Sequence, residues 1–356
     1  MRSNAKGWLV LENGRVFTGF GWGAQRETLC RWVFSTAMGG YVETVTDPAM
    51  VGLGCVMTYP LVGNYGCCTE DFASDKPRLS AMAVREIAQL ASNFRSQITL
   101  DALLTQHDIP GLYGVDTRAL VRVLREQGSL RGLMTFDATH ITGTGLVASL
   151  QRITAFRNEN PIQRVSGAAA VYNEGGQRTA AVLDIGLTRG LLRQLTNRGF
   201  CVRTFPYDTP AQEMLACKPD LVLVSNGPGA PADCPQVVET AKGIIAAGVP
   251  LAGVGLGHLM IASAEGLPIG PVAPRLGSYP VRCTATQRVT IATQGHSHTV
   301  THPGNAHITH ENVSDQTIAG LRYMDKPIYT VQFHPEGAPG PLDTLTWFDE
   351  ITAIKA

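Results

Sequence analysis

The chain has 356 residues, 16% of them charged, and its formal net charge at pH 7 is zero. This length predicts two domains, each large enough to bury its own core. Because there is no basic excess, we expect neither a nucleic-acid partner nor an anionic membrane surface as a partner. No apolar run approaches 18 residues, so we expect no membrane-spanning segment.

The cysteines and histidines give little sign of a disulfide framework or a metal site. Eight cysteines occur without a Cys-x-x-Cys motif, at positions 30, 55, 67, 68, 201, 217, 234 and 283. We therefore expect reduced, mostly buried thiols and a cytoplasmic location. His296 and His298 would share one face of a strand, yet we interpret them and the nearby histidines as solvent-facing residues and predict no metal site.

The first half of the chain mixes strand and helix signals. Apolar runs at 7–11 and 16–19 flank Asn13-Gly14, a strong signal for a hairpin turn. Further expected elements are strands at 29–34 and 54–59 and helices at 79–91, 100–107 and 119–127. We therefore predict a mixed α/β domain over residues 1–154.

The second half changes to alternating strands and helices. Residues 155–179 are polar and Gly-rich, and we predict a linker there. Beyond it, the pattern indicates strands at 180–184, 201–205, 221–224 and 251–254 and helices at 188–198, 210–216 and 234–247. Such alternation predicts a parallel sheet covered on both faces, forming a domain over residues 180–356.

Residues 251–260 have the pattern of a nucleophile elbow, in which a short strand enters a Gly-rich turn and a helix leaves it. Such a turn holds one side chain in a strained, exposed position and aims helix N–H groups at an oxyanion. Here the residue at the tip is Gly255, which carries no nucleophile. Further along, His334 and Glu336 form a His-x-Glu pair, a base with an orienting carboxylate.

Three motifs in the second half resemble the signatures of class I (triad) glutamine amidotransferases. They are Ser225-Asn226-Gly227-Pro228-Gly229, Gly253-Val254-Gly255-Leu256-Gly257-His258 and Phe333-His334-Pro335-Glu336. Further motifs resemble the small subunit of carbamoyl phosphate synthetase: Gly40-Tyr41-Val42-Glu43, Thr46-Asp47-Pro48, residues 58–66, Asp116-Thr117-Arg118 and Pro339-Gly340-Pro341. The resemblance runs from about Trp8 to Phe348, with the motifs in matching order.

This resemblance implies an architecture and a partner. The N-terminal domain would dock on a large subunit, and the C-terminal domain would have the flavodoxin-like amidotransferase fold. In the family, this second domain hydrolyses glutamine and passes ammonia to an ATP-grasp large subunit that makes carbamoyl phosphate. ATP and Mg would belong to that large subunit, so we expect no cofactor in this chain. The pathway supplied, pyrimidine or arginine synthesis, stays open.

The chain departs from the family at the positions that carry glutamine chemistry. Gly255 stands where the family has its catalytic cysteine, Leu259 where it has a glutamine, and Ala49 where it has a serine. Gly295 and Ser297 replace the asparagine and second glycine of a Gln-Asn-His-Gly stretch. We interpret these joint losses as natural decay of a glutaminase site. The other substrate-binding positions that the resemblance implies are Gly227, Gly229, Leu256 and His298.

Three functions remain open at this point. The leading hypothesis is a glutaminase-inactive small subunit that docks on the large subunit and supports or regulates its use of ammonia; His334 and Glu336 would then be structural. The second is an active glutamine-hydrolysing subunit that uses an unexpected group, although Cys234 and Cys283 fit no family role. The third is a repurposed module that binds a different small ligand in the altered pocket.

Overall fold

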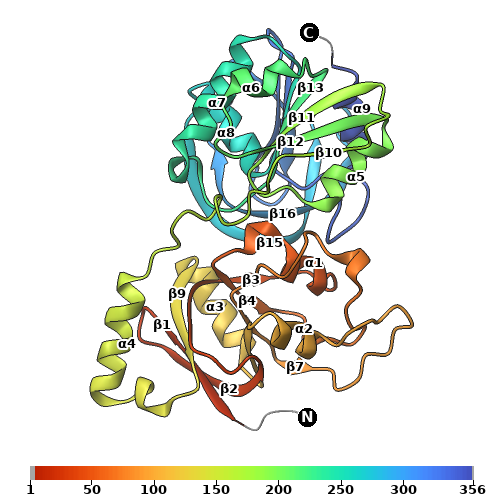
Figure 1. Cartoon of the computed structure of the whole chain (residues 1–356). Helices are drawn as coiled ribbons and strands as arrows, with labels where there is room; N and C mark the ends of the chain where they lie inside the picture. Colours follow the sequence, from red (N-terminus) through yellow and green to blue (C-terminus); the bar gives the residue numbers. More distant parts are fainter. Residues whose placement is uncertain (1–4, 355–356) are drawn as a thin grey trace. The chain divides into compact units, whose positions relative to one another are not determined.

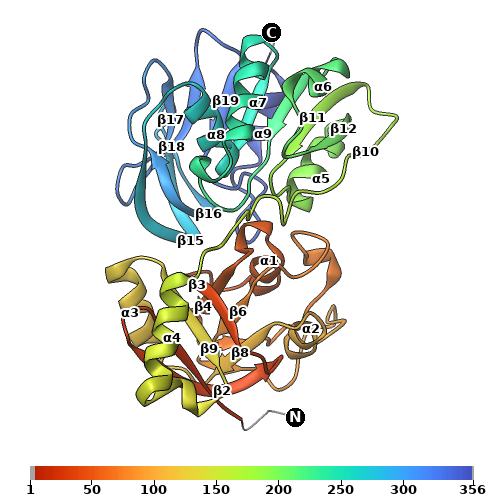
Figure 2. The same ribbon diagram turned by 60° about the vertical axis from the view of Figure 1, so that its left-hand side comes forward.

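The computed structural model describes residues 5–354, and the chain divides into two compact units, Met1–Glu159 and Asn160–Ala356. Figures 1 and 2 trace the elements of each unit. The expected linker, residues 155–179, is only partly a linker, because it contains strand β10 (Ala170–Tyr172). β10 pairs antiparallel with β12 (Phe200–Pro206), so these residues belong to the sheet of the second unit. Val171 and Tyr172 are good strand formers, which the polar surroundings concealed.

The first unit is built on a closed barrel. Its strands follow the order β1-β2-β8-β6-β4-β3-β9. Their bounds are β1 Lys6–Leu11, β2 Val16–Gly23, β3 Thr28–Ser35, β4 Leu53–Met57, β6 Ala81–Ala83, β8 Pro110–Tyr113 and β9 Leu130–Thr135. The remaining elements are β5 Leu61–Val62, β7 Glu86–Ile87, α1 Tyr41–Thr46, α2 Leu100–Gln106, α3 Thr117–Gln127, α4 Gly143–Ala155 and the 3₁₀ turns Pro48–Met50, Thr69–Asp71 and Ala138–Ile141.

The hairpin expected at Asn13-Gly14 is confirmed, since β1 and β2 pair antiparallel and Gly14 adopts a φ of +81°. The helix expected over 79–91 is wrong. Those residues contain β6 and β7, and β6 is a buried strand between β4 and β8. A short apolar run that is buried on every side shows no periodicity that separates strand from helix.

The second unit contains a ten-stranded sheet with the order β10-β12-β11-β13-β14-β19-β18-β17-β15-β16. The strands not yet given are β11 Arg178–Asp184, β13 Leu221–Val224, β14 Leu251–Val254, β15 Ile269–Cys283, β16 Val289–Val300, β17 His307–Asn312, β18 Ile318–Tyr323 and β19 Ile328–Val331. The helices are α5 Arg189–Asn197, α6 Ala211–Ala216, α7 Pro235–Ala246, α8 Leu256–Ala264 and α9 Thr346–Thr352, with a 3₁₀ turn at Pro231–Asp233.

The parallel part of this sheet has the expected flavodoxin-like order. β12, β11, β13, β14 and β19 are neighbours and all pair parallel. In sequence order this is 2-1-3-4-5, the order of doubly wound flavodoxin-like sheets. The antiparallel extension from β15 to β18 was not expected, because its strands carry few long apolar runs.

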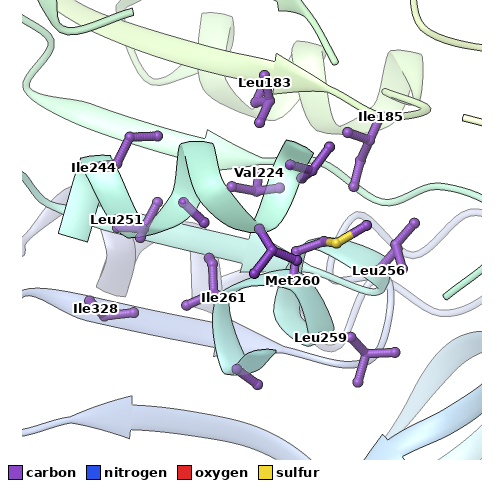
Figure 3. Packing of buried hydrophobic residues seen from close by; sticks show 14 of the residues in the cluster. Leu183, Ile185, Val224, Ile244, Leu251, Leu256, Leu259, Met260, Ile261 and Ile328 are labelled. Atoms are coloured by element: carbon purple, nitrogen blue, oxygen red, sulfur yellow. The ribbon is translucent and has the colours of Figure 1, made fainter. Parts of the chain in front are cut away.

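One buried apolar cluster joins α7 and α8 to the parallel strands. It includes Val224 and Leu251 from the sheet and Leu256, Leu259 and Met260 from α8 (Figure 3). Helices and strands that pack against each other both need apolar side chains at the contact. These apolar runs are the reason why the strand-helix alternation could be predicted from the sequence. Among residues 5–354, no helix has the length and apolarity needed to cross a membrane.

Candidate functional site

The motif residues of the second unit gather where neighbouring parallel strands end. Asn226 follows β13, Gly255 follows β14, and His334 follows β19 by three residues. β14 lies between β13 and β19 in the sheet. The carboxyl ends of the strands in such sheets are the usual place for a ligand, so this edge is the candidate site.

Gly255 forms the tip of a strand-turn-helix elbow. Its backbone has φ 58° and ψ −111°, a conformation that glycine adopts at little cost. Its N–H donates to Val331 O at 2.9 Å, which ties the tip to β19. The Gly257 N–H donates to Ser225 O at 3.1 Å, which ties the start of α8 to the loop after β13. The elbow predicted from the sequence is therefore present.

The three glycines of the elbow meet different surroundings. A Cβ on Gly257 would lie 2.1 Å from Val224 O, and one on Gly253 would lie 2.9 Å from the backbone carbonyl of Gly257. Close packing of α8 on the sheet thus requires glycine at both positions. A Cβ on Gly255 would have Asn226 Cβ at 3.4 Å and Gln332 O at 4.0 Å as neighbours, which is ordinary contact. At Gly255 the dihedral angles favour glycine, while the space would accept a side chain.

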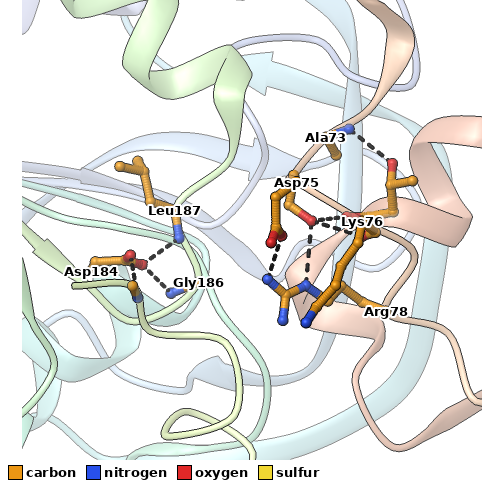
Figure 4. Close-up of polar contacts among 10 residues, drawn as sticks. Ala73, Asp75, Lys76, Arg78, Asp184, Gly186 and Leu187 are labelled. Atoms are coloured by element: carbon orange, nitrogen blue, oxygen red, sulfur yellow. Dashed lines mark hydrogen bonds and ion pairs between the residues drawn. The ribbon is translucent and has the colours of Figure 1, made fainter. Parts of the chain in front are cut away.

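The turns after β11 and β13 are held by local contacts. Asp184 Oδ1 accepts hydrogen bonds from the N–H groups of Gly186 and Leu187, at 2.9 and 2.7 Å (Figure 4). Gly227 approaches the first turn so closely that a Cβ would lie 2.0 Å from Ile185 O. Gly229 has a φ of +89°. Both glycines are therefore required by the backbone path of this loop.

His334 and Glu336 form a buried hydrogen-bonded pair. His334 Nδ1 lies 3.3 Å from Glu336 Oε1, and both residues are 4% exposed. The Thr188 hydroxyl donates to the same carboxylate oxygen at 2.8 Å. Thr188 also caps α5, because its oxygen accepts the Leu191 N–H at 3.3 Å. The pair is thus connected to the start of a helix. A histidine oriented in this way can accept a proton, but Gly255 offers no atom that could attack a carbonyl.

Two of the expected substrate-binding residues belong to the hydrophobic core. Leu256 and Leu259 are 4% and 2% exposed and are members of the cluster that packs α8 against the sheet (Figure 3). Leu259 therefore fills core volume at the position where the resemblance implies a glutamine. An apolar side chain is stable there without any polar ligand.

Of the expected residues of β16, Gly295 lies beside the pair of His334 and Glu336. A Cβ on Gly295 would be 3.8 Å from His334 Nε2, so this glycine borders the ring. Ser297 Oγ and His298 Nδ1 are 3.1 Å apart, and both side chains are half-buried. β16 reaches the pair through a bridge in which the His334 N–H donates to Thr293 O at 2.8 Å.

Ala49 belongs to the first unit. It lies in the 3₁₀ turn Pro48–Met50, and its N–H donates to Asp47 Oδ1 at 2.8 Å. The segment that follows is fixed by the Ser74 hydroxyl, which donates to Thr46 O at 2.6 Å, and by an ion pair between Arg78 and Asp75 (Figure 4). The turn that begins at Asp47 is therefore well formed, although Ala49 carries no hydroxyl.

Two histidines near the elbow have buried ring nitrogens, so the interpretation of His296 as a solvent-facing residue is wrong. His258 Nδ1 lies 2.7 Å from Thr330 Oγ1, and burial lowers the pKa of His258 to about 3. The pKa of His296 is also lowered to about 3, first by burial and then by the charges of Arg275, His258 and His334. Both rings are thus neutral at pH 7. The position of His296 in a strand of mixed burial gave no sign of this environment.

Two amide side chains beside the elbow were also missed. Asn226 and Gln332 are each 1% exposed. The Gln332 amide donates to Gly255 O over a long 3.4 Å. Asn226 lies inside a motif that the sequence already marked, and Gln332 directly precedes another. The available signal was a polar side chain next to a buried strand end.

The thiols of the chain occupy other environments. Burial raises the pKa of the Cys67 thiol to about 12, and it also raises the pKa of the Cys234 thiol. At Cys283 burial acts in the same direction, but hydrogen bonds from Thr286 and Ala285 outweigh it and the pKa is lowered. Within the described part of the chain, no group of three or more His, Cys, Asp or Glu residues is arranged to hold a metal ion.

Comparison with known proteins places these features in a family. Residues 9–134 match the family described as carbamoyl-phosphate synthase small chain, CPSase domain, and residues 181–354 match glutamine amidotransferase class-I. The carbamoyl phosphate synthase small chain of Bacillus caldolyticus is 38% identical over 352 residues, which cover 97% of this chain and 95% of that protein.

The pyrimidine-specific small chain of Bacillus subtilis is 38% identical over 345 residues, covering 96% of this chain and 93% of that protein. The solved structure of a glutamine amidotransferase from Thermotoga maritima is 17% identical with a TM-score of 0.37, covering 45% of this chain and 76% of that one. On the near full-length similarity at 38% identity, the chain belongs to the carbamoyl phosphate synthase small chain family.

Proposed function

We propose that this small chain is inactive as a glutaminase, and that it docks on an ATP-grasp large subunit and supports or regulates carbamoyl phosphate synthesis from ammonia. The observation that carries the proposal is Gly255 at the tip of the elbow. Hydrolysis of a carboxamide by a triad enzyme begins with a thiolate that attacks the carbonyl. In this proposal Gly255 replaces that cysteine, so the first covalent step cannot occur.

The surroundings of the elbow support the same proposal. Leu259 is packed into the core, and Gly295, which borders the His334 ring, carries no polar side chain. A glutamine ligand brings an amide, a carboxylate and an ammonium group, each of which needs a polar partner when it leaves water. A site without those partners would select poorly for glutamine even if it had a nucleophile.

Docking makes different demands on the chain. A subunit interface needs a stable, shaped surface and needs no nucleophile. The first unit, a closed barrel with its own buried core, would supply this surface. ATP and Mg would be bound by the large subunit, and this chain would contribute contacts and conformational support.

The direct test is glutamate release from glutamine by the purified full chain. We expect no release above a no-protein blank. A Gly255→Cys variant should gain one thiol that reacts with iodoacetamide, because the structure has room for a side chain there. A wild-type rate comparable with that of an intact triad enzyme would refute the proposal.

The second candidate function is an active glutaminase that uses Cys283 as its nucleophile. It rests on one observation, the lowered pKa of the Cys283 thiol. A thiol with a lowered pKa is more often present as the reactive thiolate. If the chain hydrolyses glutamine through this residue, Cys283→Ser should abolish glutamate release. Iodoacetamide should then inactivate the wild type and, to the same extent, the control variant Cys234→Ser. Glutamate release that survives Cys283→Ser would exclude this route.

A further inference from the structure

The outward face of helix α3 in the first unit carries a line of arginines. Arg118, Arg122 and Arg125 are all exposed, and their spacing of four and three residues places them within about 60° of one another around the helix axis. The opposite face of α3 packs into the barrel core through Leu120 and Leu124 (Figure 2). The three arginine side chains are called the arginine face below.

This arrangement works against the stability of the helix. Arg118 lies in the first turn, where the helix dipole disfavours positive charge, and only Arg125, in the last turn, suits the dipole. The spacing also brings like charges together along the helix surface, which destabilises a helix. The one acidic residue of α3 is Glu126, and none of the three arginines forms an ion pair within residues 5–354. Because the fold gains nothing from this charge, the arginine face points to a partner outside the chain.

A fourth arginine extends the positive charge beyond the end of α3. Arg31 of β3 is exposed and donates to Ser129 O and Oγ at 3.1 and 3.2 Å, directly after the helix. The acidic residue just before the helix, Asp116, is already used as its N-cap and accepts the Ala119 N–H at 3.0 Å. The positive charge is therefore local and continuous, and it covers a span of about 10 Å on α3 alone.

The chemistry of the arginine face favours carboxylates on another protein. Guanidinium groups are weakly hydrated and bind carboxylates through two parallel hydrogen bonds, and arginine is enriched at protein interfaces. A nucleic acid suits the chain less well, because its binding needs a basic excess and the net charge here is zero. Helix α3 lies within residues 9–134, which match the small-chain domain, whereas the second unit matches class I amidotransferases in general. The arginine face thus belongs to the part of the chain that is particular to this family.

We propose that the arginine face of α3 is a docking surface for the large subunit, and that its counterpart there is a row of carboxylates spanning about 10 Å. This inference rests on the proposed function in one respect, the docking on a large subunit. It adds the place on the first unit where the contact is made and the chemistry that holds it. Opposite charges at such a contact also speed the association of the two proteins.

The test is the affinity of the full chain for its cognate large subunit, measured by biolayer interferometry. A variant that combines Arg118→Glu, Arg122→Glu and Arg125→Glu should bind about 100-fold more weakly, because attraction becomes repulsion. The affinity of the wild type should fall between about 0.1 and about 1 M salt, since salt screens exposed charges. The variant should not show this fall.

Three arginines of the second unit provide the matched control. Arg193, Arg203 and Arg288 are also exposed, and replacing all three with glutamate changes the net charge by the same amount. This control variant should bind the large subunit within about threefold of the wild type, because isolated surface charges contribute little.

A neutral variant separates docking from stability. Combining Arg118→Gln, Arg122→Gln and Arg125→Gln removes the repulsion along α3 and keeps residues of similar helix propensity, so the Tm of the chain should not fall. The same variant should bind the large subunit about tenfold more weakly. A lower Tm would assign the arginines to the stability of the fold and would overturn the inference.

The outcomes distinguish this inference from the proposed function. If the wild type binds the large subunit and the glutamate variant binds equally well, the inference fails and the proposed docking stands. If the wild type does not bind at all, the proposed docking fails and the inference fails with it. If the glutamate variant loses affinity for a short duplex DNA but not for the large subunit, the arginine face serves a nucleic acid and the inference is wrong.

Discussion

The two sides of the candidate site are built differently. On one side, His334, Glu336 and Thr188 are buried and joined by hydrogen bonds, and Thr188 also caps α5. On the other side, the tip of the elbow is a glycine whose Cβ position meets its neighbours only at ordinary contact distances. The hydrogen bonds among His334, Glu336 and Thr188 stabilise the fold and would also orient a catalytic base. A side chain at Gly255 would serve only as a nucleophile. Loss of activity can therefore remove one side and leave the other in place.

The elbow itself repeats this contrast over three residues. Gly257 touches Val224 O so closely that the helix position depends on it, while Gly255 lacks any such contact. Persistence of the elbow shape is thus a consequence of packing between α8 and the sheet. It gives no evidence that a reaction takes place there.

The largest effect should come from Gly257→Ala. Its Cβ would lie 2.1 Å from Val224 O, so α8 would have to move away from β13. We expect a loss of about 3 kcal/mol in the free energy of unfolding, measured by denaturant titration of the full chain. A loss below about 1 kcal/mol would mean that α8 is not held as tightly as the structure indicates.

Removal of the carboxylate should rank next. Glu336→Ala would leave the Thr188 hydroxyl and His334 Nδ1 without their shared partner, at a cost of about 2–3 kcal/mol in the free energy of unfolding. Glu336→Gln keeps an oxygen that can accept from Thr188 and should cost less. If both variants unfold like the wild type, the pair has no structural role and the contrast between the two sides fails.

The buried histidine next to the elbow predicts a dependence on pH. The pKa of His258 is about 3 in the folded chain and about 6.5 when it is unfolded. The unfolded state therefore binds more protons between these values, and stability falls as the pH is lowered from about 6.5 towards 3. His258→Gln should make this dependence shallower by up to about 1.4 kcal/mol per pH unit. An unchanged slope in unfolding measured from pH 7 to pH 4 would contradict the burial of this ring.

Gly255→Ala should have the smallest effect. The space accepts the methyl group, and only the positive φ of 58° opposes it, at a cost of about 1 kcal/mol. Measured beside Gly257→Ala, this variant tests whether the two glycines differ as the contacts indicate. Equal losses at both positions would remove the distinction.

The sequence predicted the second unit better than the first. Strand 221–224 and the elbow strand 251–254 have the observed bounds, because each is a short apolar run between clear turn signals. The barrel of the first unit was not predicted, since β6 pairs with strands far away in the sequence and its residues show no period. Non-local pairing of this kind cannot be inferred from a local pattern.

The candidate site was predicted in part for a similar reason. The positions of Gly255, His334 and Glu336 followed from motifs, and the structure brings their strand ends together. The link from Glu336 to Thr188 joins residues 148 positions apart, which the sequence pattern does not reveal. Leu259 was expected to line a pocket, and its burial in the core could be seen only once α8 was packed on the sheet.

The most direct test of the central proposal is carbamoyl phosphate formation by this chain mixed with its cognate large subunit. Glutamine or ammonium would be supplied as the sole nitrogen source, with ATP and bicarbonate present. We predict product with ammonium and none above background with glutamine. Product formed from glutamine would contradict the proposal, because it would require a nucleophile that Gly255 cannot supply.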